Sequence, residues 1–198
     1  MFLYPNAMSF RADRGDFTVV PWCAELINDP EFVPSITYSR IPKKSTEDSF
    51  FAETLATDRT IRECLTIHSR PNPDLEVPIQ EVRTFLNLGS GVNGYPNVCH
   101  GGFVATMLDE VMGVLLTVNQ LWIKDHRGGR EHIMQMTAFL NIKFKQPVRT
   151  PQIVLTTAKI SKLEPRKWYI TGTIEDSNRQ ILSTGEALFV EARTDPRL

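Results

Sequence analysis

Apolar residues at every second position mark two segments after residue 60 as strands. Segments 61–67 and 82–88 both alternate in this way, which is the spacing of one face of a strand. In the first segment Ile61, Leu65 and Ile67 are expected to share a face. The turn-forming sequence PNPD lies between the two segments at 71–74. They are therefore predicted to form a hairpin.

Four more strands are predicted in the C-terminal part of the chain. They cover 133–146, 151–164, 167–177 and 180–193, and prolines or turn residues separate them. The first alternates most strictly, with Leu140, Ile142 and Phe144 in its apolar row. Thr137 falls in the other row, so it is expected on the polar face of the strand.

One long helix is predicted over 101–119, and the polar segment 124–132 is expected to connect it to the next strand. The helix is apolar nearly all round, so burial of a single stripe would leave much of it exposed. A curved antiparallel sheet wrapped around a central helix would enclose it. The order of hairpin, helix and four strands thus predicts an α+β domain of this architecture.

An N-terminal extension, 1–58, is predicted to precede this domain, 59–198. Its first sixteen residues read as a loose arm. A short helix then begins at Pro21, which suits a first turn, and stops before Pro30. Residues 34–58 are mixed in character and are expected to wrap irregularly over the surface of the domain.

The charge balance gives no reason to expect an anionic partner. The chain has 198 residues, with 22 Lys and Arg against 23 Asp and Glu and a net charge of −1. Neither nucleic acid nor an anionic membrane surface is therefore expected to bind. The longest apolar stretch, 103–118, is short for a bilayer and carries Asp109 and Glu110 at its centre. Each would cost about 2.5–3.5 kcal/mol there, so no membrane span is expected.

Cysteine usage points to a reducing compartment. Cys23, Cys64 and Cys99 have neither CxxC nor zinc-type spacing, so neither a disulfide scaffold nor a structural metal is expected. The opening residues lack a secretory signal, and Asp13 and Asp16 argue against an organellar presequence. A cytoplasmic location is predicted, with a mitochondrial one left open.

The candidate chemistry begins where the glycine-rich loop 89–96 leads into the long helix. His100, Gly101 and Gly102 lie at this junction. The first N–H groups of a helix have no internal partner and carry the positive end of its dipole. Two glycines let a substrate approach this backbone, where such donors can polarise a carbonyl. Alternatively, Gly101 and Gly102 serve only to form a tight turn between the loop and the helix.

Two adjacent carboxylates interrupt the apolar helix. A buried carboxylate needs a partner, and its pKa is expected to rise. Asp109 lies on a face of small residues with Gly102 and Gly113, which another molecule could approach. Glu110 lies beside larger apolar residues and is expected only to surface at a helix end or a groove.

The spacing of these groups restricts how they could act together. Gly101 and Asp109 are eight residues apart, which is about 12 Å along a helix. A carbonyl held by Gly101 and a water activated by Asp109 must come within about 3 Å of each other. Two antiparallel helices related by a two-fold axis can achieve this, whereas one helix cannot. An active site here is therefore predicted to lie across a dimer interface.

Three segments carry a resemblance to a known family: HGGFVATMLDEVMG at 100–113, MTAFLNIKFKQP at 136–147 and PRKWYITGTIED at 165–176. Over about 60–192 the chain resembles the hotdog-fold acyl-CoA thioesterases, of the phenylacetate-pathway type and its mammalian relatives, thioesterase superfamily members 4 and 5. The resemblance implies a hotdog fold, homodimers that can pair into tetramers, and hydrolysis of acyl-CoA to acid and free CoA. It implies no cofactor, since CoA is part of the substrate.

The resemblance also implies roles for residues. Asp109 would be the general base or the nucleophile, and His100 with the Gly101 amide would orient and polarise the thioester carbonyl. Thr137 would hydrogen-bond the attacking water or the carboxylate. Arg166 and Lys167 would reach the phosphates of CoA.

One position departs from the family pattern. Some relatives place an asparagine six residues before the histidine, where this chain has Gly94, so that role is not assigned. The first 59 residues carry no motif that transfers.

Other functions stay open at this stage. A non-catalytic acyl-CoA binder would keep the same cleft, and a thioesterase acting on an acylated carrier protein would cleave the same bond. A hydratase or dehydratase of this fold usually has an Asp and a His about five residues apart or a His-Phe-Pro-Gly loop, and neither occurs here. Asp125, His126, Glu131 and His132 could bind a metal by composition, but a solvated charged loop is expected instead.

Overall fold

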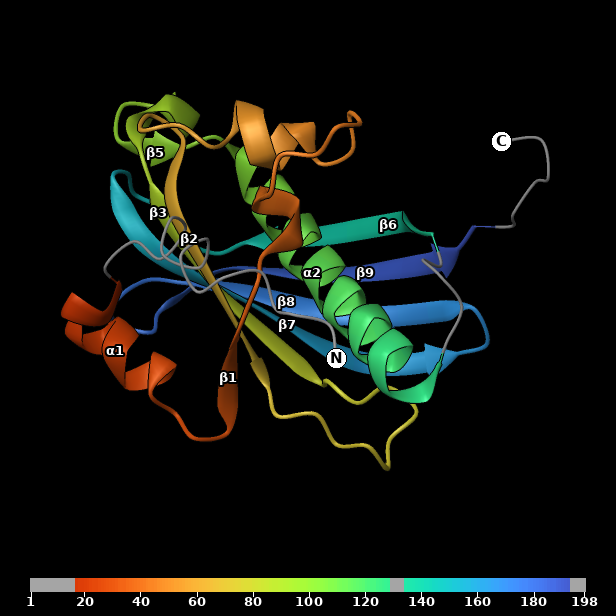
Figure 1. Cartoon of the computed structure of the whole chain (residues 1–198). Coiled ribbons are helices and arrows are strands. Elements are labelled where there is room, and N and C mark those ends of the chain that lie inside the picture. Colours follow the sequence, from red (N-terminus) through yellow and green to blue (C-terminus); the bar gives the residue numbers. More distant parts are fainter. Residues whose placement is uncertain (1–16, 129–133, 193–198) are drawn as a thin grey trace.

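Seven antiparallel strands form one curved sheet around a single long helix (Figure 1). The computed structural model describes residues 17–128 and 134–192. The strand order across the sheet is β1-β2-β3-β7-β8-β9-β6, which makes β1 and β6 the edges. The strands are β1 (Phe32–Ser35), β2 (Ile61–Ser69), β3 (Glu81–Leu88), β6 (Gln135–Phe144), β7 (Gln152–Glu164), β8 (Lys167–Glu175) and β9 (Ile181–Glu191). The predicted hairpin, helix and four strands are all present, which confirms the α+β class.

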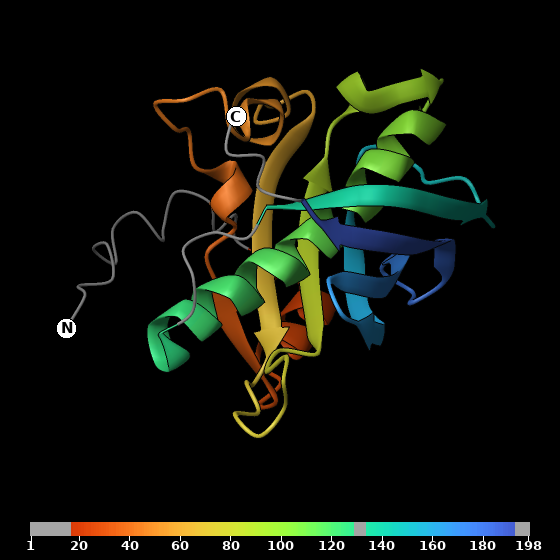
Figure 2. The same ribbon diagram turned by 90° about the vertical axis from the view of Figure 1, so that its right-hand side faces the viewer.

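The long helix α2 (Gly101–Arg127) lies across one face of the sheet and supplies the main core (Figure 2). Met107, Leu108 and Met112 are fully buried. Gly172 of β8 lets the helix come close, because a Cβ there would lie 2.7 Å from Met112 Cε. By length and apolarity α2 also passes as a membrane span, as core helices do, and 56% of its most apolar stretch is buried inside the domain.

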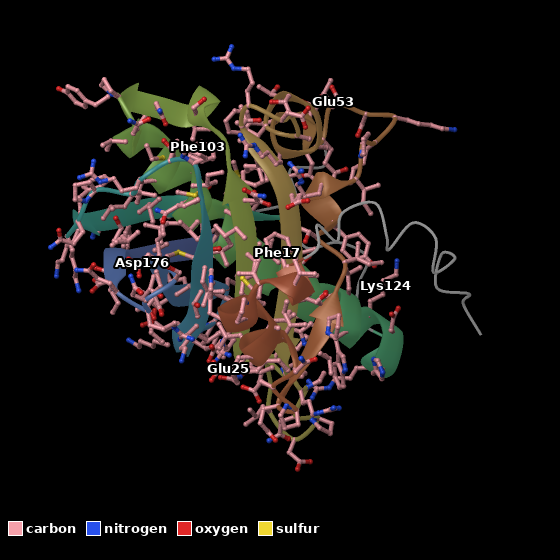
Figure 3. All side chains as sticks on the ribbon, turned by 90° about the vertical axis from the view of Figure 1, so that its left-hand side faces the viewer. Phe17, Glu25, Glu53, Phe103, Lys124 and Asp176 are labelled. Carbon is pink, nitrogen blue, oxygen red and sulfur yellow. The ribbon has the colours of Figure 1, made fainter. Side chains whose placement is uncertain are left out.

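A second, smaller core covers the other face of the sheet. The predicted short helix is α1 (Pro21–Ile27), with Pro21 in its first turn, and the turn η2 (Phe17–Val19) precedes it. The rings of Phe17 and Trp22 lie 5.8 and 5.7 Å from that of Phe85. Figure 3 shows Phe17 against the sheet between α1 and β2. The N-terminal extension therefore contributes its own hydrophobic contacts to the domain.

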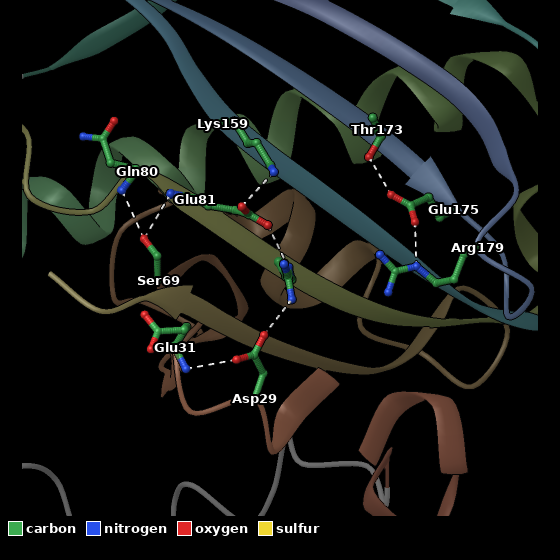
Figure 4. Close-up of polar contacts among 10 residues, drawn as sticks. Asp29, Glu31, Ser69, Gln80, Glu81, Lys159, Thr173, Glu175 and Arg179 are labelled. Atoms are coloured by element: carbon green, nitrogen blue, oxygen red, sulfur yellow. Dashed lines mark hydrogen bonds and ion pairs between the residues drawn. The ribbon is translucent and has the colours of Figure 1, made fainter. Parts of the chain in front are cut away.

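Beyond α1, the outer face of the sheet is polar and its charges are paired (Figure 4). Arg83 contacts Asp29 at 3.7 Å and Glu81 at 2.7 Å. Lys159 also reaches Glu81, and Arg179 pairs with the Glu175 carboxylate at 2.8 Å. These pairs line a shallow hollow with charges of both signs, which suits a sheet face exposed to solvent.

The wrap over 34–58 is less irregular than predicted. Its first residues belong to β1, which pairs antiparallel with β2 from Phe32 opposite Ser69 to Ser35 opposite Thr66. Pro34 argued against a strand, but β1 is at the sheet edge, where a missing N–H is tolerated.

The rest of the wrap is held to β2 by one arginine. It forms the turn η3 (Tyr38–Arg40) and the π-helical turn η4 (Phe50–Thr54). Arg40 donates hydrogen bonds to the carbonyl oxygens of Phe51, Leu55 and Ile61 at 3.1–3.3 Å. The guanidinium thus joins the wrap to the first residue of β2.

The expected common face of Ile61, Leu65 and Ile67 is wrong. A bulge between Ile61 and Glu63 shifts the register of β2 against β3. Ile61 therefore joins the core around α2, whereas Leu65 and Ile67 face α1 on the opposite side. One extra residue reverses the alternation of side chains.

The long helix extends eight residues beyond its predicted end, through the first part of the segment expected to be a connection. The rings of Trp122 and His126 stack 4.3 Å apart, and the Arg127 guanidinium donates to carbonyl oxygens of the β2–β3 connection at 2.6–3.0 Å. Basic residues in the last turn also suit the negative end of the helix dipole. Gly128, with φ of 65°, then ends the helix.

The loop 89–96 contains structure of its own. It forms the turn η5 (Ser90–Val92) and the strand β4 (Asn93–Tyr95), which pairs with β5 (Val98–Cys99) immediately before α2. The backbone N–H of His100 donates to the Val92 carbonyl at 2.8 Å. This small hairpin fixes the position from which the helix starts.

Asn119 fixes the far half of α2 to the connection between β2 and β3. The residue is fully buried. Its Oδ1 accepts from the Ile79 N–H at 2.8 Å, and its Nδ2 donates to the carbonyl oxygens of Ile79 and Leu115 at 2.8 and 2.9 Å. All of its contacts are to backbone, so its role is structural.

Candidate active site

A bulge in β6 turns Thr137 toward the helix, which corrects the predicted orientation of this residue. The register of β6 against β9 shifts between Thr137 and Phe139, so Ala138 is the extra residue. Thr137 pairs with Phe189, and Leu140 pairs with Ala187. Both partners belong to the core around α2, so Thr137 lies on the same face as Leu140. Bulges commonly redirect side chains at functional sites.

Thr137 meets Asp109 of α2 directly. Its Oγ1 donates to Asp109 Oδ1 at 2.9 Å. Asp109 is partly exposed, as are Ala105, Thr106 and Gly113 on the same side of the helix. The small-residue face predicted from the sequence is therefore the part of α2 that neither the sheet nor the wrap fully covers.

The start of α2 presents a backbone donor. His100 is the N-cap residue, and its Nδ1 accepts from the Gly102 N–H at 2.9 Å. A neutral imidazole that accepts at Nδ1 carries its proton on Nε2. Gly101 N–H has no hydrogen bond within the described part of the chain, and both Gly101 and His100 are exposed. These two donors can polarise a carbonyl placed between them.

Two neighbours define the space around these donors. A Cβ on Gly101 would lie 3.7 Å from the Phe144 ring at the end of β6. A Cβ on Gly94 would lie 2.9 Å from His100 Cδ2. The histidine ring therefore occupies the space beside the position where some relatives have asparagine.

Within one chain the structure does not bring the two halves of the site together. Asp109 and Thr137 lie at the first half of β6, whereas His100 and Gly101 lie beside Phe144 at its end. About 12 Å of helix separates Gly101 from Asp109.

Glu110 lies at a groove, as the sequence indicated, but the contact of that groove with the wrap was not predicted. Burial raises the pKa of its carboxyl to about 7, and the Ser39 hydroxyl offsets part of that rise. Glu110 lines a cleft of about 370 Å³ between α2 and the wrap. The wrap carried no family motif, and its contact with α2 joins residues about 70 positions apart, so no local pattern could reveal it.

Arg166 lies in the turn between β7 and β8, and Lys167 is the first residue of β8. Arg166 has φ of 64°, and its guanidinium contacts the Glu191 carbonyl oxygen at 3.1 Å and carboxylate at 3.4 Å. Lys167 Nζ lies 3.8 Å from Glu164. Lys167 pairs with Val190 of β9, which pairs with Met136 of β6. The turn therefore lies at the Thr137 end of the sheet, two strands or about 10 Å away from β6.

The cysteines and candidate metal ligands form no site in the described residues. Cys23, Cys64 and Cys99 are free and buried, and burial raises the pKa of the Cys99 thiol to about 12, which disfavours a thiolate nucleophile. Within the described residues, 17–128 and 134–192, no group of His, Cys, Asp and Glu side chains could hold a metal ion. Glu131 and His132 lie outside the described residues.

Comparison with known proteins identifies the region that carries this site. A sequence profile of the thioesterase superfamily matches residues 96–183. The chain is 32% identical to verlamelin biosynthesis protein B of a Lecanicillium species, over 58% of each chain. It is 31% identical to acyl-coenzyme A thioesterase THEM4 of Rattus norvegicus, over 56% of this chain and 43% of that protein. The chain thus spans about half the length of the curated relatives it matches.

A solved structure supports the architecture. The chain superimposes on zebrafish thioesterase superfamily member 2 with a TM-score of 0.55 and 13% identity, over 79% of this chain and 94% of that one. This similarity concerns the fold alone. The profile match bears out the resemblance to the thioesterase superfamily over residues 96–183, and the superposition confirms that the sheet wrapped around α2 is a hotdog fold.

Proposed function

We propose that the protein hydrolyses acyl-CoA thioesters, with Asp109 as the residue that activates water or attacks the thioester carbon. The observation that carries this proposal is the hydrogen bond from Thr137 Oγ1 to Asp109 Oδ1, at 2.9 Å, on the uncovered stripe of α2. The bond orients the carboxylate and leaves Oδ2 free for a water molecule. The relatives named acyl-coenzyme A thioesterase support the same reaction.

The site is completed by a second copy of the chain, paired through β6. This strand is an edge of the sheet, and most of its residues are exposed. An exposed edge can pair with another strand. In an antiparallel pair about a two-fold axis, the Phe144 end of one β6 meets the Thr137 end of its partner. Gly101 of one protomer, which lies beside Phe144, then approaches Asp109 of the other.

The start of α2 would bind the thioester carbonyl. The Gly101 N–H and His100 Nε2–H are the donors directed at the oxygen that becomes negative in the tetrahedral intermediate. Such donors are worth about 3–4 kcal/mol each in acyl transfer. Gly102 keeps the helix start open and, through its N–H, holds the His100 ring in place.

The reaction then needs no group besides these side chains and water. Asp109 takes a proton from water, and the water oxygen bonds to the thioester carbon. The C–S bond breaks as the intermediate collapses, which yields the carboxylic acid and CoA thiolate. In the alternative route Asp109 attacks the carbon itself, the C–S bond breaks and CoA thiolate leaves, and water then hydrolyses the resulting mixed anhydride to the acid and free Asp109. Labelled solvent oxygen in Asp109 after a single turnover would distinguish the two routes.

Arg166 and Lys167 are placed to bind the nucleotide end of CoA. Their turn lies on the side of the sheet where Thr137 begins β6. Each cation already contacts an acid, Glu191 or Glu164, and the exposed pairs exchange readily for phosphate because surface ion pairs are weak.

The deciding experiment measures free thiol released from a panel of acyl-CoA esters, with Asp109→Asn as the comparison. Turnover by the native protein that is lost in Asp109→Asn supports the proposal. Stable binding of the esters without thiol release would instead identify a non-catalytic binder. A change in an acyl double bond without thiol release would identify a hydratase. Competition between acyl-CoA and an acylated carrier protein separates the two thioester substrates.

Size-exclusion chromatography with light scattering tests the dimer. We expect a dimer, or a tetramer built from dimers. A protein that is active as a monomer would contradict the shared site.

A further inference from the structure

The cleft beside Asp109 has both apolar and polar walls. It measures about 370 Å³ and lies between α2 and the wrap, with one side closed by Gln135 and Phe189 of the sheet. Ile36, Val114 and Leu121 give it apolar surface. A ligand that fills such a cleft must be largely apolar, with a few groups that match the polar positions.

Two of those polar positions, Ser39 and Glu110, lie within reach of each other at the cleft. Ser39 Oγ is buried and makes no hydrogen bond of ordinary geometry. It lies close enough to Glu110 to affect that carboxyl. The charged groups around Glu110 are Asp48 and Asp109, which disfavour its ionised form, and Arg40, which favours it. Buried polar groups normally find a partner, so Ser39 and Glu110 together indicate where a polar atom of a ligand would bind.

A row of small residues leads along α2 from Asp109 into the cleft. Gly113 follows Asp109 by one turn, and a Cβ there would meet no atom within 4 Å. Thr117 comes next, with its hydroxyl turned back to the Gly113 carbonyl at 3.1 Å. Gln120 then donates to Gln135 Oε1 at 2.8 Å, which closes the far end.

The length of this row sets the length of the chain that fits. Asp109 and Gln120 are about 16 Å apart along the helix. An extended chain advances about 1.2 Å per bond, as a polypeptide does over its three bonds per residue. The thioester carbon lies about 3 Å from the Asp109 carboxylate, so about 13 Å remains, which is about eleven bonds. The cleft therefore fits an acyl chain of up to about twelve carbons.

We infer that the preferred substrates are thioesters of medium-length acyl chains that carry a hydroxyl or oxo group within the first few carbons, bound by Glu110 and Ser39. The inference rests on the proposed function, since it places the thioester carbon at Asp109. Glu110 follows Asp109 directly in the helix, so its partner on the acyl chain must be near the thioester. The carboxyl can donate a hydrogen bond when protonated and accept one when ionised.

The test compares three CoA esters of equal length: decanoyl, 3-hydroxydecanoyl and 10-hydroxydecanoyl. We expect kcat/KM for the 3-hydroxy ester to exceed that for decanoyl by about tenfold, because the unsubstituted chain offers no polar group to Glu110 and leaves Ser39 Oγ without a hydrogen bond of ordinary geometry. The 10-hydroxy ester controls for position, and it should show no such gain. Equal kcat/KM values for decanoyl and 3-hydroxydecanoyl would overturn the inference while leaving the hydrolysis intact.

Variants assign the preference to its residues. In Glu110→Leu and Ser39→Ala the ratio of 3-hydroxydecanoyl to decanoyl should fall toward one. Glu25→Gln, a change at an exposed carboxyl on α1 (Figure 3), should leave the ratio unchanged. Both Glu110→Leu and Ser39→Ala are measured, so that the test still stands if one of them does not fold. A ratio that stays near ten in both folded variants would contradict the assignment.

Binding gives a reading that does not depend on turnover. In the Asp109→Asn background, calorimetric titration should show tighter binding of 3-hydroxydecanoyl-CoA than of decanoyl-CoA, and Glu110→Leu should remove the difference. This preference without any hydrolysis by the native protein would refute the proposed function and support the binding site. Hydrolysis by the native protein with no difference in binding between the two esters would support the proposed function and refute the binding site.

Discussion

Thr137 Oγ1 donates to Asp109 Oδ1 at 2.9 Å and so joins the edge strand β6 to the central helix. Thr137 is exposed and Asp109 is only partly covered. A hydrogen bond open to solvent adds little to stability. Its value lies in fixing which oxygen of the carboxylate faces the space where a substrate would lie.

Substitutions of this pair should affect turnover far more than substrate binding. Asp109→Asn is expected to lower kcat by about 10²–10³-fold, since general-base catalysis contributes on this scale. Thr137→Ala should lower kcat by about tenfold, the worth of one orienting hydrogen bond, and Thr137→Ser should restore most of it. Steady-state thiol release checks this. A rise in KM at constant kcat for Thr137→Ala would contradict an orienting role.

The bulge takes up Ala138 as an extra residue, so that Thr137 keeps facing α2, and this can be tested by deletion. Without Ala138, Thr137 would pair with Phe189 in a regular register and would still face α2, because adjacent strand residues alternate. The deletion protein should therefore retain most of the activity, and Thr137→Ala should lower its kcat by the same factor as in the native protein.

The substitution Ala138→Gly is the matched control, since it keeps the extra residue and should retain most of the activity. Circular dichroism would check that both variants fold. A folded deletion protein with kcat as low as that of Thr137→Ala would contradict the assigned register.

The strands that obey the period of two were predictable, and the places where the period breaks were not. The bulges at Ile61 and Ala138 each reverse a face, and neither segment contains a glycine or proline to signal it. The strand β1 was hidden by Pro34, which only its edge position tolerates. Helix α2 extends beyond its predicted end at 119 because the stacked rings of Trp122 and His126 and the hydrogen bonds of Arg127 stabilise the last turns.

For the site, local chemistry was visible and long-range contact was not. The carboxylate in an apolar helix and the glycines at the helix start singled out Asp109 and Gly101 from the sequence. The contact of Thr137 with Asp109 came from the family resemblance, and the cleft at Glu110 depends on a wrap without any transferable motif. Such contacts are set by the path of the chain, which periodicity does not encode.

Asn119 is expected to be the most sensitive polar position in the core. In Asn119→Ala, the buried N–H and carbonyl of Ile79 lose their partners, which should destabilise the fold by about 3 kcal/mol. For a domain of this size the Tm would fall by about 6–12 °C. Calorimetry checks this, and the exposed Asn178→Ala should shift stability by less than about 0.5 kcal/mol.

Arg166 should affect binding of CoA and not the chemical step. Arg166→Ala is expected to raise KM for acyl-CoA by about three- to tenfold at unchanged kcat, the loss of one exposed phosphate contact. The matched substrate is the acyl-pantetheine thioester, which lacks the nucleotide, and its kinetics should be the same in both proteins. An equal loss with both substrates would place the effect in the fold of the β7–β8 turn, where Arg166 contacts Glu191.

Glu110 should make the stability of the protein fall as the pH rises. Burial raises the pKa of this carboxyl from 4.5 to about 7, so between these values the folded protein keeps a proton that the unfolded chain has released. Unfolding then releases a proton and is favoured by higher pH. Below pH 4.5 and above pH 7 the folded and unfolded states bind the same number of protons at this group, so its contribution to stability no longer changes with pH. The loss is on the order of 3 kcal/mol. Glu110→Gln removes this titration, so urea unfolding at pH 5 and pH 8 should show a smaller decline in the variant than in the native protein. Equal declines in the two would mean that the Glu110 carboxyl keeps an ordinary pKa and is solvated in the cleft.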